Sequence, residues 1–463
     1  MISKLGFLGQ PRVVFARLRK RAGASLLESA NLMPGLSGWS YIACDPVMTL
    51  ETRSELTVLR EGSKIIQFWD NPFTALDMMF ERFHLEPDIR PEGMGFAGGW
   101  LGYLGYDLVR FLEDIPNITP KLGQTDLKLH LMDFILAFDH ANLTWYSSGI
   151  KLDFANREHI WAEILELAQH GGNIQGQFNA GKLKPLTKPE VYLEHVEQCL
   201  EYIRAGDIFQ VNLTHRLEAE FAGDTFALYQ ALMLSNPAPF SAFLSGEDLT
   251  VVSASPERFL KRTGNTLEAR PIKGTVPRGS TPTKDDIQKN KLEQSEKDRA
   301  ENLMIVDLMR NDLGRVAEFG SVQTSKLFSL EPHGAVWQMV STITAKLKPN
   351  LSSIDVLRAT FPPGSMTGAP KVRAMQLIEE FENFKRGIFS GSVGYINPDG
   401  DFDFNVVIRS IIYNAETKQL SIPVGSAITA KSDAMQEYNE CILKAQGMLK
   451  ALGVDQVSSI IEK

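Results

Sequence analysis

The alternation of apolar and polar positions predicts short strands in the first third of the chain and a mixture of strands and longer helices beyond it. Up to about residue 165, short apolar runs alternate with glycine-rich turns, and a helical period follows from Arg157 to Gln169. Further strands are predicted at residues 208–213, 249–253, 266–269 and 406–412, and they alternate irregularly with helices. No internal repeat is evident. This order predicts an α+β fold with large layered sheets and helices packed outside, rather than a regular βαβ barrel.

A change of composition near residue 187 divides the chain into two regions. Residues 171–187 are rich in Gly, Gln and Lys and show little periodicity, which indicates a linker. Thr187, with Pro189 and Glu190 behind it, is typical of a capping box, and the helix that it opens is predicted to end before Gly206. The sequence therefore predicts an N-terminal region of residues 1–170 and a second region of residues 188–463.

Composition and charge restrict the class of protein. A chain of 463 residues, 43% of them hydrophobic, can bury a substantial core, and its net charge of −8 argues against a nucleic-acid partner. The longest strongly apolar stretch, residues 131–138, contains Asp133 and is too short to cross a bilayer. We therefore expect no nucleic-acid partner and no membrane span.

The use of cysteine bears on the cellular compartment. Cys44, Cys199 and Cys441 lie far apart, which supports neither a disulfide framework nor a zinc site and favours a reducing cytoplasm. The first 27 residues hold six basic residues and no acidic one, which faintly resembles an organelle transit peptide. The simpler interpretation is the first strand and helix of the folded protein.

Lys273 is the residue whose surroundings point most directly to chemistry. It lies in the run Arg270-Pro271-Ile272-Lys273-Gly274-Thr275, between a rigid Pro-Ile pair and a flexible glycine. Desolvation at such a strand-to-turn position would lower the pKa of the lysine, and an uncharged amine can attack carbon. The alternative is a surface lysine beside a turn, the usual setting for this residue type.

Two pairs of carboxylates have the spacing that a divalent cation needs. Asp298 and Glu301 lie three residues apart on a helix predicted over residues 295–314, and Glu437 and Glu440 repeat this spacing on a second helix. Oxygen ligands from two helices suit Mg²⁺. Each pair alone is equally typical of a solvated helix face, so the hypothesis requires the two pairs to converge.

Residues 361–371 and the nearby strand offer sites for carboxylates. The segment leads into a helix through Pro370, and the free backbone amides at that helix start, beside Lys371, would bind an anion. It lacks the spacing of a nucleotide phosphate loop, so a carboxylate fits better. Arg409, at the end of a predicted strand, could bind a second carboxylate, or it is an ordinary exposed arginine.

Glu257 is a candidate general acid. It follows Pro256 in Ser255-Pro256-Glu257-Arg258, so a proline-fixed bend would hold its carboxyl group in place. A carboxylic acid with a raised pKa there could protonate a leaving group. A single Ser-Pro-Glu turn is common and specifies little by itself.

Taken together, these runs resemble the chorismate-utilising family, which includes anthranilate, aminodeoxychorismate, isochorismate and salicylate synthases. The resemblance covers about residues 190 to 445, with weaker support from residues 26–30 in the more variable N-terminal region. It implies the anthranilate synthase component I type of fold, with residues 188–463 as the chorismate-binding catalytic domain. The motifs that carry it are SPER at 255–258, RPIKGT at 270–275, DRAENLM at 298–304, DLMRND at 307–312, GAPK at 368–371 and RAM at 373–375.

Three positions indicate a reaction within this family. The resemblance implies that Ala at position 273 accompanies anthranilate formation and that Lys accompanies amination at C4, giving 4-amino-4-deoxychorismate for p-aminobenzoate and folate synthesis. Isochorismate-forming members carry a water-activating Lys where this chain has Gln210, and anthranilate synthases carry a His where it has Gln338. The alternatives are anthranilate synthesis and a non-catalytic, metabolite-binding regulatory subunit.

The resemblance also implies a role for each candidate residue. Glu301 and Glu437, with Glu440 and Asp298 nearby, would hold Mg²⁺ against the ring carboxylate of chorismate, while Lys273 attacks C2 and Glu257 protonates the departing hydroxyl group. The remaining substrate contacts would come from Thr275, Ser365, Lys371, Tyr395, Arg409, Gly425 and Ser426.

Ammonia must come from elsewhere. No cysteine lies in the Gly-x-Cys-x-Gly setting of a glutaminase, so the resemblance implies a separate glutamine amidotransferase subunit in a heterodimer. Glu28 and Ser29 lie in the segment that forms a tryptophan pocket in anthranilate synthases. Here they could bind tryptophan structurally, bind it as an inhibitor, or only pack inside the fold.

Overall fold

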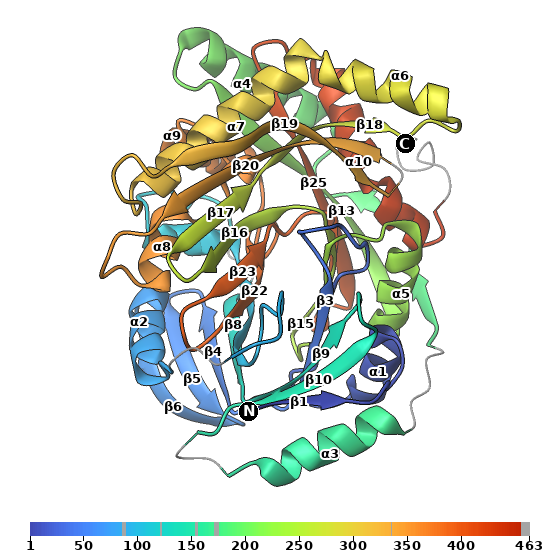
Figure 1. Cartoon of the computed structure of the whole chain (residues 1–463). Helices are drawn as coiled ribbons and strands as arrows, with labels where there is room; N and C mark the ends of the chain where they lie inside the picture. The colour runs from blue at the N-terminus through green and yellow to red at the C-terminus, as the bar shows by residue number, and fades with distance from the viewer. Residues whose placement is uncertain (86–88, 121–122, 153–155, 171–175, 335, 455–463) are drawn as a thin grey trace.

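Two large antiparallel sheets form the centre of the molecule, and helices cover their outer faces (Figure 1). The computed structural model describes residues 1–454 apart from 86–88, 121–122, 153–155, 171–175 and 335. This arrangement confirms the predicted α+β layers. The first sheet has the order β1 (Ile2–Leu5), β10 (Thr144–Gly149), β9 (Phe134–Asp139), β3 (Trp39–Ala43), β2 (Ser25–Glu28), β14 (Phe240–Leu244), β15 (Leu249–Ser255), β24 (Ser410–Asn414), β25 (Gln419–Thr429), β13 (Gln210–Gly223) and β11 (Phe178–Ala180), with β12 (Lys184–Pro185) and β21 (Gly368–Ala369) also on β13.

In the second sheet, Lys273 lies near the start of one strand, and Glu257 directly precedes the start of another. The order of this sheet is β18 (Ile272–Pro277), β20 (Val336–Lys346), β17 (Thr266–Arg270), β16 (Arg258–Thr263), β23 (Phe402–Asn405), β22 (Ser392–Ile396), β7 (Gly99–Leu104), β8 (Thr125–Met132), β4 (Met48–Arg53), β5 (Leu56–Glu61) and β6 (Lys64–Trp69), with β19 (Gln323–His333) on β20.

Three apolar clusters hold these layers together. One lies between the two sheets, and the other two lie under the helices on their outer faces. β9 shows why a continuous apolar run is needed: Phe134, Leu136 and Phe138 point into one cluster, and Ile135 and Ala137 point into another. The apolar stretch at residues 131–138 is therefore explained by strands buried on both faces. Among the described residues, no helix is long and apolar enough to span a membrane.

The two sequence regions share both sheets. β2 pairs with β14 in the first sheet, and β7 pairs with β22 in the second, so strands from before residue 170 lie beside strands from beyond residue 188. The predicted linker differs from the structure in its second part, because β11 and β12 lie there and pair with β13. These strands have two or three residues, too few for an alternating pattern to show. Residues 171–175 lie outside the described part.

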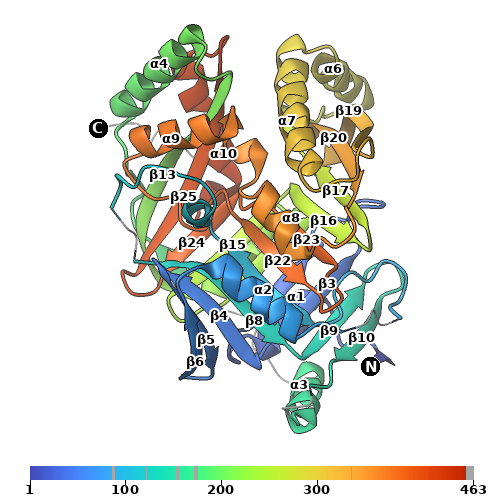
Figure 2. The same cartoon turned by 90° about the vertical axis from the view of Figure 1, so that its left-hand side faces the viewer.

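Two groups of helices lie on opposite sides of the molecule, with α4 and α10 in one group and α6 and α7 in the other (Figure 2). α4 and α10 pack on β25, whereas α6 and α7 pack on β18 and β20. The helix predicted to start with Thr187 as its cap instead has Lys188 at that position, without a side-chain capping hydrogen bond, and ends at Gly206 as predicted. The helices are α1 (Pro11–Leu18), α2 (Pro72–Arg82), α3 (Glu158–Gln169), α4 (Pro189–Ala205), α5 (Thr225–Ser235), α6 (Pro282–Glu293), α7 (Glu296–Gly314), α8 (Ser353–Thr360), α9 (Lys371–Phe381) and α10 (Ala434–Ala451), with 3₁₀ turns η1 (Tyr106–Phe111) and η2 (Gly364–Met366).

Candidate active site

Lys273 lies at an irregularity in β18. Ile272 pairs with Val340 and Thr275 with Gln338, so β18 has one residue more than β20 between these two pairs. Such a bulge bends a strand and turns a side chain out of its regular alternation. Gly274 makes the bend feasible, because its φ of +87° is unfavourable for residues with a Cβ. The sequence Pro-Ile-Lys-Gly-Thr therefore places Lys273 at a strand position that a regular ladder would not provide.

The surroundings of Lys273 favour its uncharged form. Burial lowers the pKa of Lys273, and the positive charge of Lys444 lowers it further, against the opposing effects of Glu301, Glu257 and Glu440. Lys444 was not singled out from the sequence, although it follows Glu440 by one helical turn. Its Nζ donates a hydrogen bond to the carbonyl of Gly425 at 2.9 Å and lies 2.7 Å from Glu440 Oε1.

Glu257 lies beside Lys273 and retains its proton more readily than an ordinary carboxyl group. Burial raises the pKa of Glu257 to about 7, although a hydrogen bond from Ser365 and the charge of Lys273 both oppose this. The backbone around Glu257 is fixed, because its carbonyl accepts a hydrogen bond from the amide of Val406 at 3.0 Å. A carboxyl group with this pKa can both donate and accept a proton near neutral pH.

Acidic side chains from α7 and α10 meet across the site. Glu437 is buried, with 2% of its side chain exposed, and Glu301 has 14% exposed. Lys297 joins them: its Nζ lies 3.5 Å from Glu437 Oε1 and 3.8 Å from Glu301 Oε1. Asp298 packs beside the bulge, since a Cβ added at Gly274 would lie 2.9 Å from the Asp298 Cβ.

The acidic residues offer oxygen ligands, but they are not gathered around one point. Burial raises the pKa of Glu301, and its Oε1 atom is buried without a hydrogen-bond partner. Burial alone would raise the pKa of Glu440 as well, yet the neighbouring Lys444 lowers it overall. Within the described ranges, no three His, Cys, Asp or Glu side chains approach closely enough to hold a metal ion. Carboxylate chemistry and the unpartnered Glu301 oxygen nevertheless fit a hard cation.

Three further predicted substrate contacts, Arg409, Gly425 and Ser426, differ in the direction in which they present their polar groups. Arg409 has the left-handed φ of +52°, and burial lowers its pKa while Glu440 raises it. This backbone conformation also explains why the strand predicted at residues 406–412 begins only at Ser410. Gly425 presents its carbonyl to Lys444, whereas the Ser426 hydroxyl points into the core and lies 3.2 Å from the hydroxyl of Tyr192.

Two predicted contacts have other surroundings. Thr275 is exposed on β18. The Lys371 amine lies 2.9 Å from Asp312 Oδ2 and 2.7 Å from the Thr360 carbonyl, so it joins the start of α9 to the end of α7. Both hydrogen bonds direct the amine of Lys371 into protein contacts.

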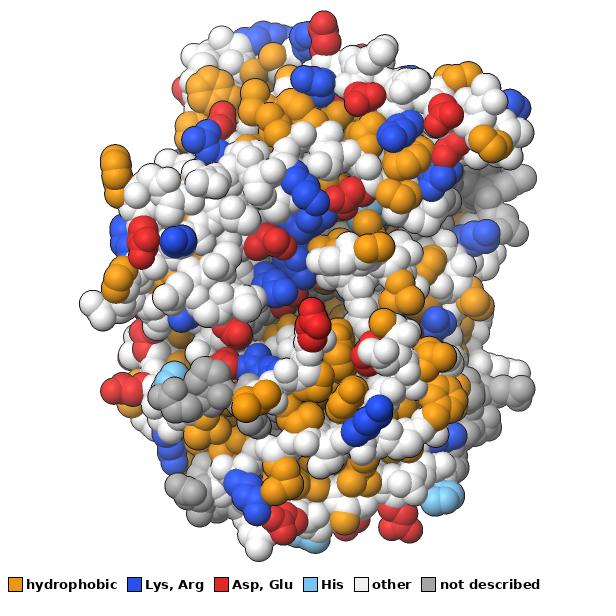
Figure 3. Space-filling model, in the orientation of Figure 1, with side chains coloured by type: hydrophobic (Ala, Val, Ile, Leu, Met, Phe, Trp, Pro, Cys, Tyr) orange, Lys and Arg blue, Asp and Glu red, His pale blue; other side chains and the backbone are white. Residues whose placement is uncertain are grey.

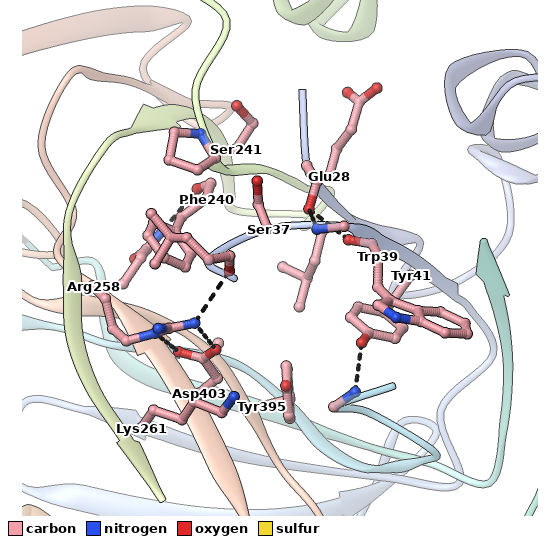
Figure 4. A pocket seen from close by; sticks show the side chains of 18 of the residues that line it. Glu28, Ser37, Trp39, Tyr41, Phe240, Ser241, Arg258, Lys261, Tyr395 and Asp403 are labelled. Atoms are coloured by element: carbon pink, nitrogen blue, oxygen red, sulfur yellow. Dashed lines mark hydrogen bonds and ion pairs between the residues drawn. The ribbon is translucent and has the colours of Figure 1, made fainter. Parts of the chain in front are cut away.

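Tyr395 belongs to a separate pocket with Glu28 and Ser29 (Figure 4). Its ring packs against Tyr41, with ring centroids 5.8 Å apart, in a cavity that Arg258 also lines. The Glu28 side chain points away from the cavity: its oxygens accept hydrogen bonds from Arg12 at 2.9 Å and Tyr229 at 2.6 Å. The Ser29 hydroxyl donates to the Trp39 carbonyl at 2.8 Å.

A row of polar side chains on β13 was missed as a group. Gln210, Asn212 and Thr214 lie on one face of the strand, are at most 3% exposed, and carry side-chain oxygens that have no hydrogen-bond partner among the described residues. A Cβ at Gly425 would lie 2.6 Å from Asn212 Oδ1. The alternation of polar residues inside an apolar strand was the available signal, because buried polar atoms without partners are costly unless they serve a ligand.

On the face shown in Figure 3, Lys, Arg, Asp and Glu side chains gather along the centre of the molecule. The family of chorismate binding enzymes matches residues 38–450, so the chain belongs to this family. It is 39% identical over 443 residues to aminodeoxychorismate synthase component 1 of Escherichia coli, with 95% of both chains covered. Anthranilate synthase component 1 of Acinetobacter calcoaceticus is 33% identical, with 96% of this chain and 92% of the relative covered. The crystal structure of anthranilate synthase component I from Streptococcus pneumoniae superposes with a TM-score of 0.77, at 29% identity over 90% of this chain and 93% of the other.

Proposed function

We propose that this chain aminates chorismate at C4, producing 4-amino-4-deoxychorismate, as its similarity to aminodeoxychorismate synthase component 1 suggests. The observation that carries the proposal is the position of Lys273 at the β18 bulge beside Glu257. A lysine with a lowered pKa and a carboxylic acid with a pKa of about 7 form a nucleophile and acid pair that works near neutral pH.

The first half of the reaction forms a covalent bond to the protein. The uncharged Nζ of Lys273 attacks ring C2, the ring double bonds shift, and the bond from C4 to its hydroxyl group breaks. Glu257 gives its proton to the departing oxygen, which therefore leaves as water and not as hydroxide. The product of this half-reaction is a secondary ammonium group between Lys273 and C2, and Glu257 is left as a carboxylate, so the two new charges balance.

The second half reverses the shift of electrons. Ammonia adds at C4, the double bonds move back, and the bond between C2 and the Lys273 nitrogen breaks. One of the protons from the new C4 ammonium group returns to Glu257, so both residues end in their starting forms. The net reaction consumes chorismate and ammonia and yields 4-amino-4-deoxychorismate and water. Dividing one substitution into two easier ones is the general advantage of covalent catalysis.

Mg²⁺ is the cofactor that we assign to the acidic residues of α7 and α10. Glu301 and Glu437 would hold it, with Glu440 and Asp298 nearby, because carboxylate oxygens suit a hard cation and Glu301 Oε1 lacks another partner. When bound, the cation would neutralise the ring carboxylate of the substrate. Arg409, Ser365, Thr275 and the backbone at Gly425 and Ser426 stay proposed substrate contacts, and the Ser365 hydroxyl also donates a hydrogen bond to Glu257. Lys371 is held by Asp312, and Tyr395 lines the separate pocket.

Ammonia would be supplied by a separate glutamine amidotransferase subunit. The three cysteines, Cys44, Cys199 and Cys441, are free and buried, so none presents the accessible thiol that a glutaminase needs. Free cysteines also agree with a reducing cytoplasm, the compartment that we propose.

The pocket of Glu28, Ser29 and Tyr395 is the place where tryptophan would bind, as in the family members whose corresponding segment forms such a pocket. Because Arg12 and Tyr229 already hold the Glu28 carboxylate, a ligand would meet backbone groups and aromatic rings there. Calorimetric titration with tryptophan tests this part of the proposal. Loss of tryptophan binding in Tyr395→Ala would show that the binding site is this pocket.

One assay separates the proposed activity from its alternatives. The purified chain is incubated with chorismate, Mg²⁺ and ammonium, and the products are resolved by mass and fluorescence. We expect 4-amino-4-deoxychorismate. Anthranilate as the direct product would replace the proposal with the second family activity, and an absence of chorismate consumption would favour a regulatory, metabolite-binding subunit.

A further inference from the structure

Lys297 occupies a special place among the acidic residues, because its ammonium group bridges the two helices that carry them. It is the second residue of α7, and it lies within ion-pair distance of Glu301 on its own helix and of Glu437 on α10. The side chain is partly exposed and its ammonium group faces two carboxylates, so Lys297 carries the ordinary positive charge of a lysine.

The ammonium group and a divalent cation would use the same oxygen atoms. Lys297 Nζ faces Oε1 of Glu301 and Oε1 of Glu437, the two residues assigned above to Mg²⁺. The contact to Glu301 is long, at 3.8 Å, and leaves that oxygen without a hydrogen bond. A metal ion needs oxygens at much shorter distances, about 2.1 Å for Mg²⁺, and two cations this close to one another repel strongly. Lys297 and the metal therefore exclude each other from this position.

The charges of the neighbouring groups support this exclusion. Glu301 and Glu440 also face Lys273, and Glu440 faces Lys444 as well. A divalent cation would neutralise the carboxylates once the Lys297 ammonium had left them. The Lys297 ammonium group can move away from the carboxylates, because 44% of the side chain is exposed and its flexible stem can turn towards solvent.

We infer that Lys297 is an internal counter-cation that holds Glu301 and Glu437 in place and is displaced when the divalent cation binds. This inference rests on the proposed metal site. It explains why the acidic residues lie near one another without being gathered around one point: the ammonium group spaces them at ion-pair distances. Lys297 thus lowers the affinity for the metal and keeps the carboxylates from repelling one another.

Calorimetric titration with magnesium chloride, without chorismate, tests the inference on two variants of Lys297. Lys297→Met removes the competing charge and should bind Mg²⁺ roughly tenfold more tightly than the natural chain, the size expected for losing two partly exposed ion pairs. Lys297→Arg keeps the charge and should stay within about twofold of the natural chain. Unchanged or weaker Mg²⁺ binding by Lys297→Met would overturn the inference.

Glu301→Gln separates this outcome from a failure of the metal site. If that variant binds Mg²⁺ as the natural chain does, the ion lies elsewhere and both the site and the inference fall. If Glu301→Gln loses Mg²⁺ but Lys297→Met gains nothing, the site stands and only the role of Lys297 is wrong.

Thermal unfolding provides a readout that a merely structural lysine would not reproduce. In EDTA, Lys297→Met should unfold at a lower temperature than the natural chain, because Glu301 and Glu437 have lost their counter-charge. Saturating Mg²⁺ should remove or reverse that difference, since binding to the folded state stabilises it. An equal loss of Tm in EDTA and in Mg²⁺ would contradict the inference.

Discussion

Arg258 and Asp403 join β16 to β23 through two parallel hydrogen bonds, from Nε to Oδ1 at 2.9 Å and from Nη2 to Oδ2 at 2.8 Å. Arg258 is 4% exposed and directly follows Glu257 in the chain. The pair therefore fixes the backbone from which the proposed general acid projects, at the point where the pairing of β16 is irregular.

Asp403→Asn should lower the stability of the protein by about 3 kcal/mol, because it leaves a buried guanidinium without its bidentate partner. The midpoint of thermal unfolding measures the effect. Glu268→Gln is the matched control: Glu268 contacts the same arginine at 2.7 Å, but 31% of its side chain is exposed, and we expect a loss below about 1 kcal/mol. Equal losses of stability in the two variants would show that the buried pair of Arg258 and Asp403 contributes no more than the partly exposed contact to Glu268.

Gly274→Ala should damage the site more than a change of backbone preference alone explains. Alanine would have to adopt the unfavourable φ of +87°, and its methyl group would lie 2.9 Å from the Asp298 Cβ. The methyl group would therefore push α7 away from β18. We expect at least a hundredfold loss of activity, because a displacement of this size misplaces Lys273 relative to the acids.

Gly264→Ala provides the control for this variant. Gly264 also has a positive φ, +55°, but no atom lies within 4 Å of its added Cβ. It should lose about 1 kcal/mol of stability and retain activity. Full activity of Gly274→Ala would contradict the role assigned to the bulge.

The rate of the first half-reaction should depend on pH through Glu257 and Lys273. Glu257 must be protonated to donate, and its pKa is raised to about 7, so the rate should fall as the pH rises above about 7. Lys273 must be uncharged to attack, so the rate should also fall at low pH, and the lowered pKa of Lys273 moves that limb towards neutrality. Stopped-flow measurements of chorismate consumption would record both limbs.

Glu257→Gln should lose the alkaline limb of this profile and should be about a hundredfold slower, since general acid catalysis commonly contributes such a factor. Glu257→Asp, which keeps a carboxyl group, should retain the alkaline limb. If the alkaline limb survives in Glu257→Gln, then a group other than Glu257 causes it.

The chemistry at Lys273 was more predictable from the sequence than its spatial setting. Pro-Ile-Lys-Gly-Thr marks a strand that turns, and the pairs at residues 298 and 301 and at 437 and 440 have helical spacing, so both kinds of element could be anticipated. The convergence of α7 and α10 could not be anticipated, because it depends on long-range strand pairings within each of the two sheets, such as β13 with β25 and β18 with β20.

Long-range contacts also decided the other differences. Tyr395 was grouped with the substrate contacts, yet the pairing of β22 with β7 places it beside Tyr41 and Phe96. Lys371 and Ser426 were predicted from their motifs alone, whereas Asp312 and Tyr192, which hold their side chains, come from distant segments. Motifs name residue types, but the partners of each side chain come from the fold.

Mass spectrometry of the intact protein tests the central claim most directly. The chain is mixed with chorismate and Mg²⁺ without ammonia, and the reaction is stopped with acid. We predict an added mass equal to chorismate less one water, located by peptide mapping on Lys273. The adduct should be absent in Lys273→Ala, and it should be lost when ammonium is added before the acid. An adduct on Lys444 or Lys297, or product formation by Lys273→Ala at the natural rate, would contradict the covalent role of Lys273.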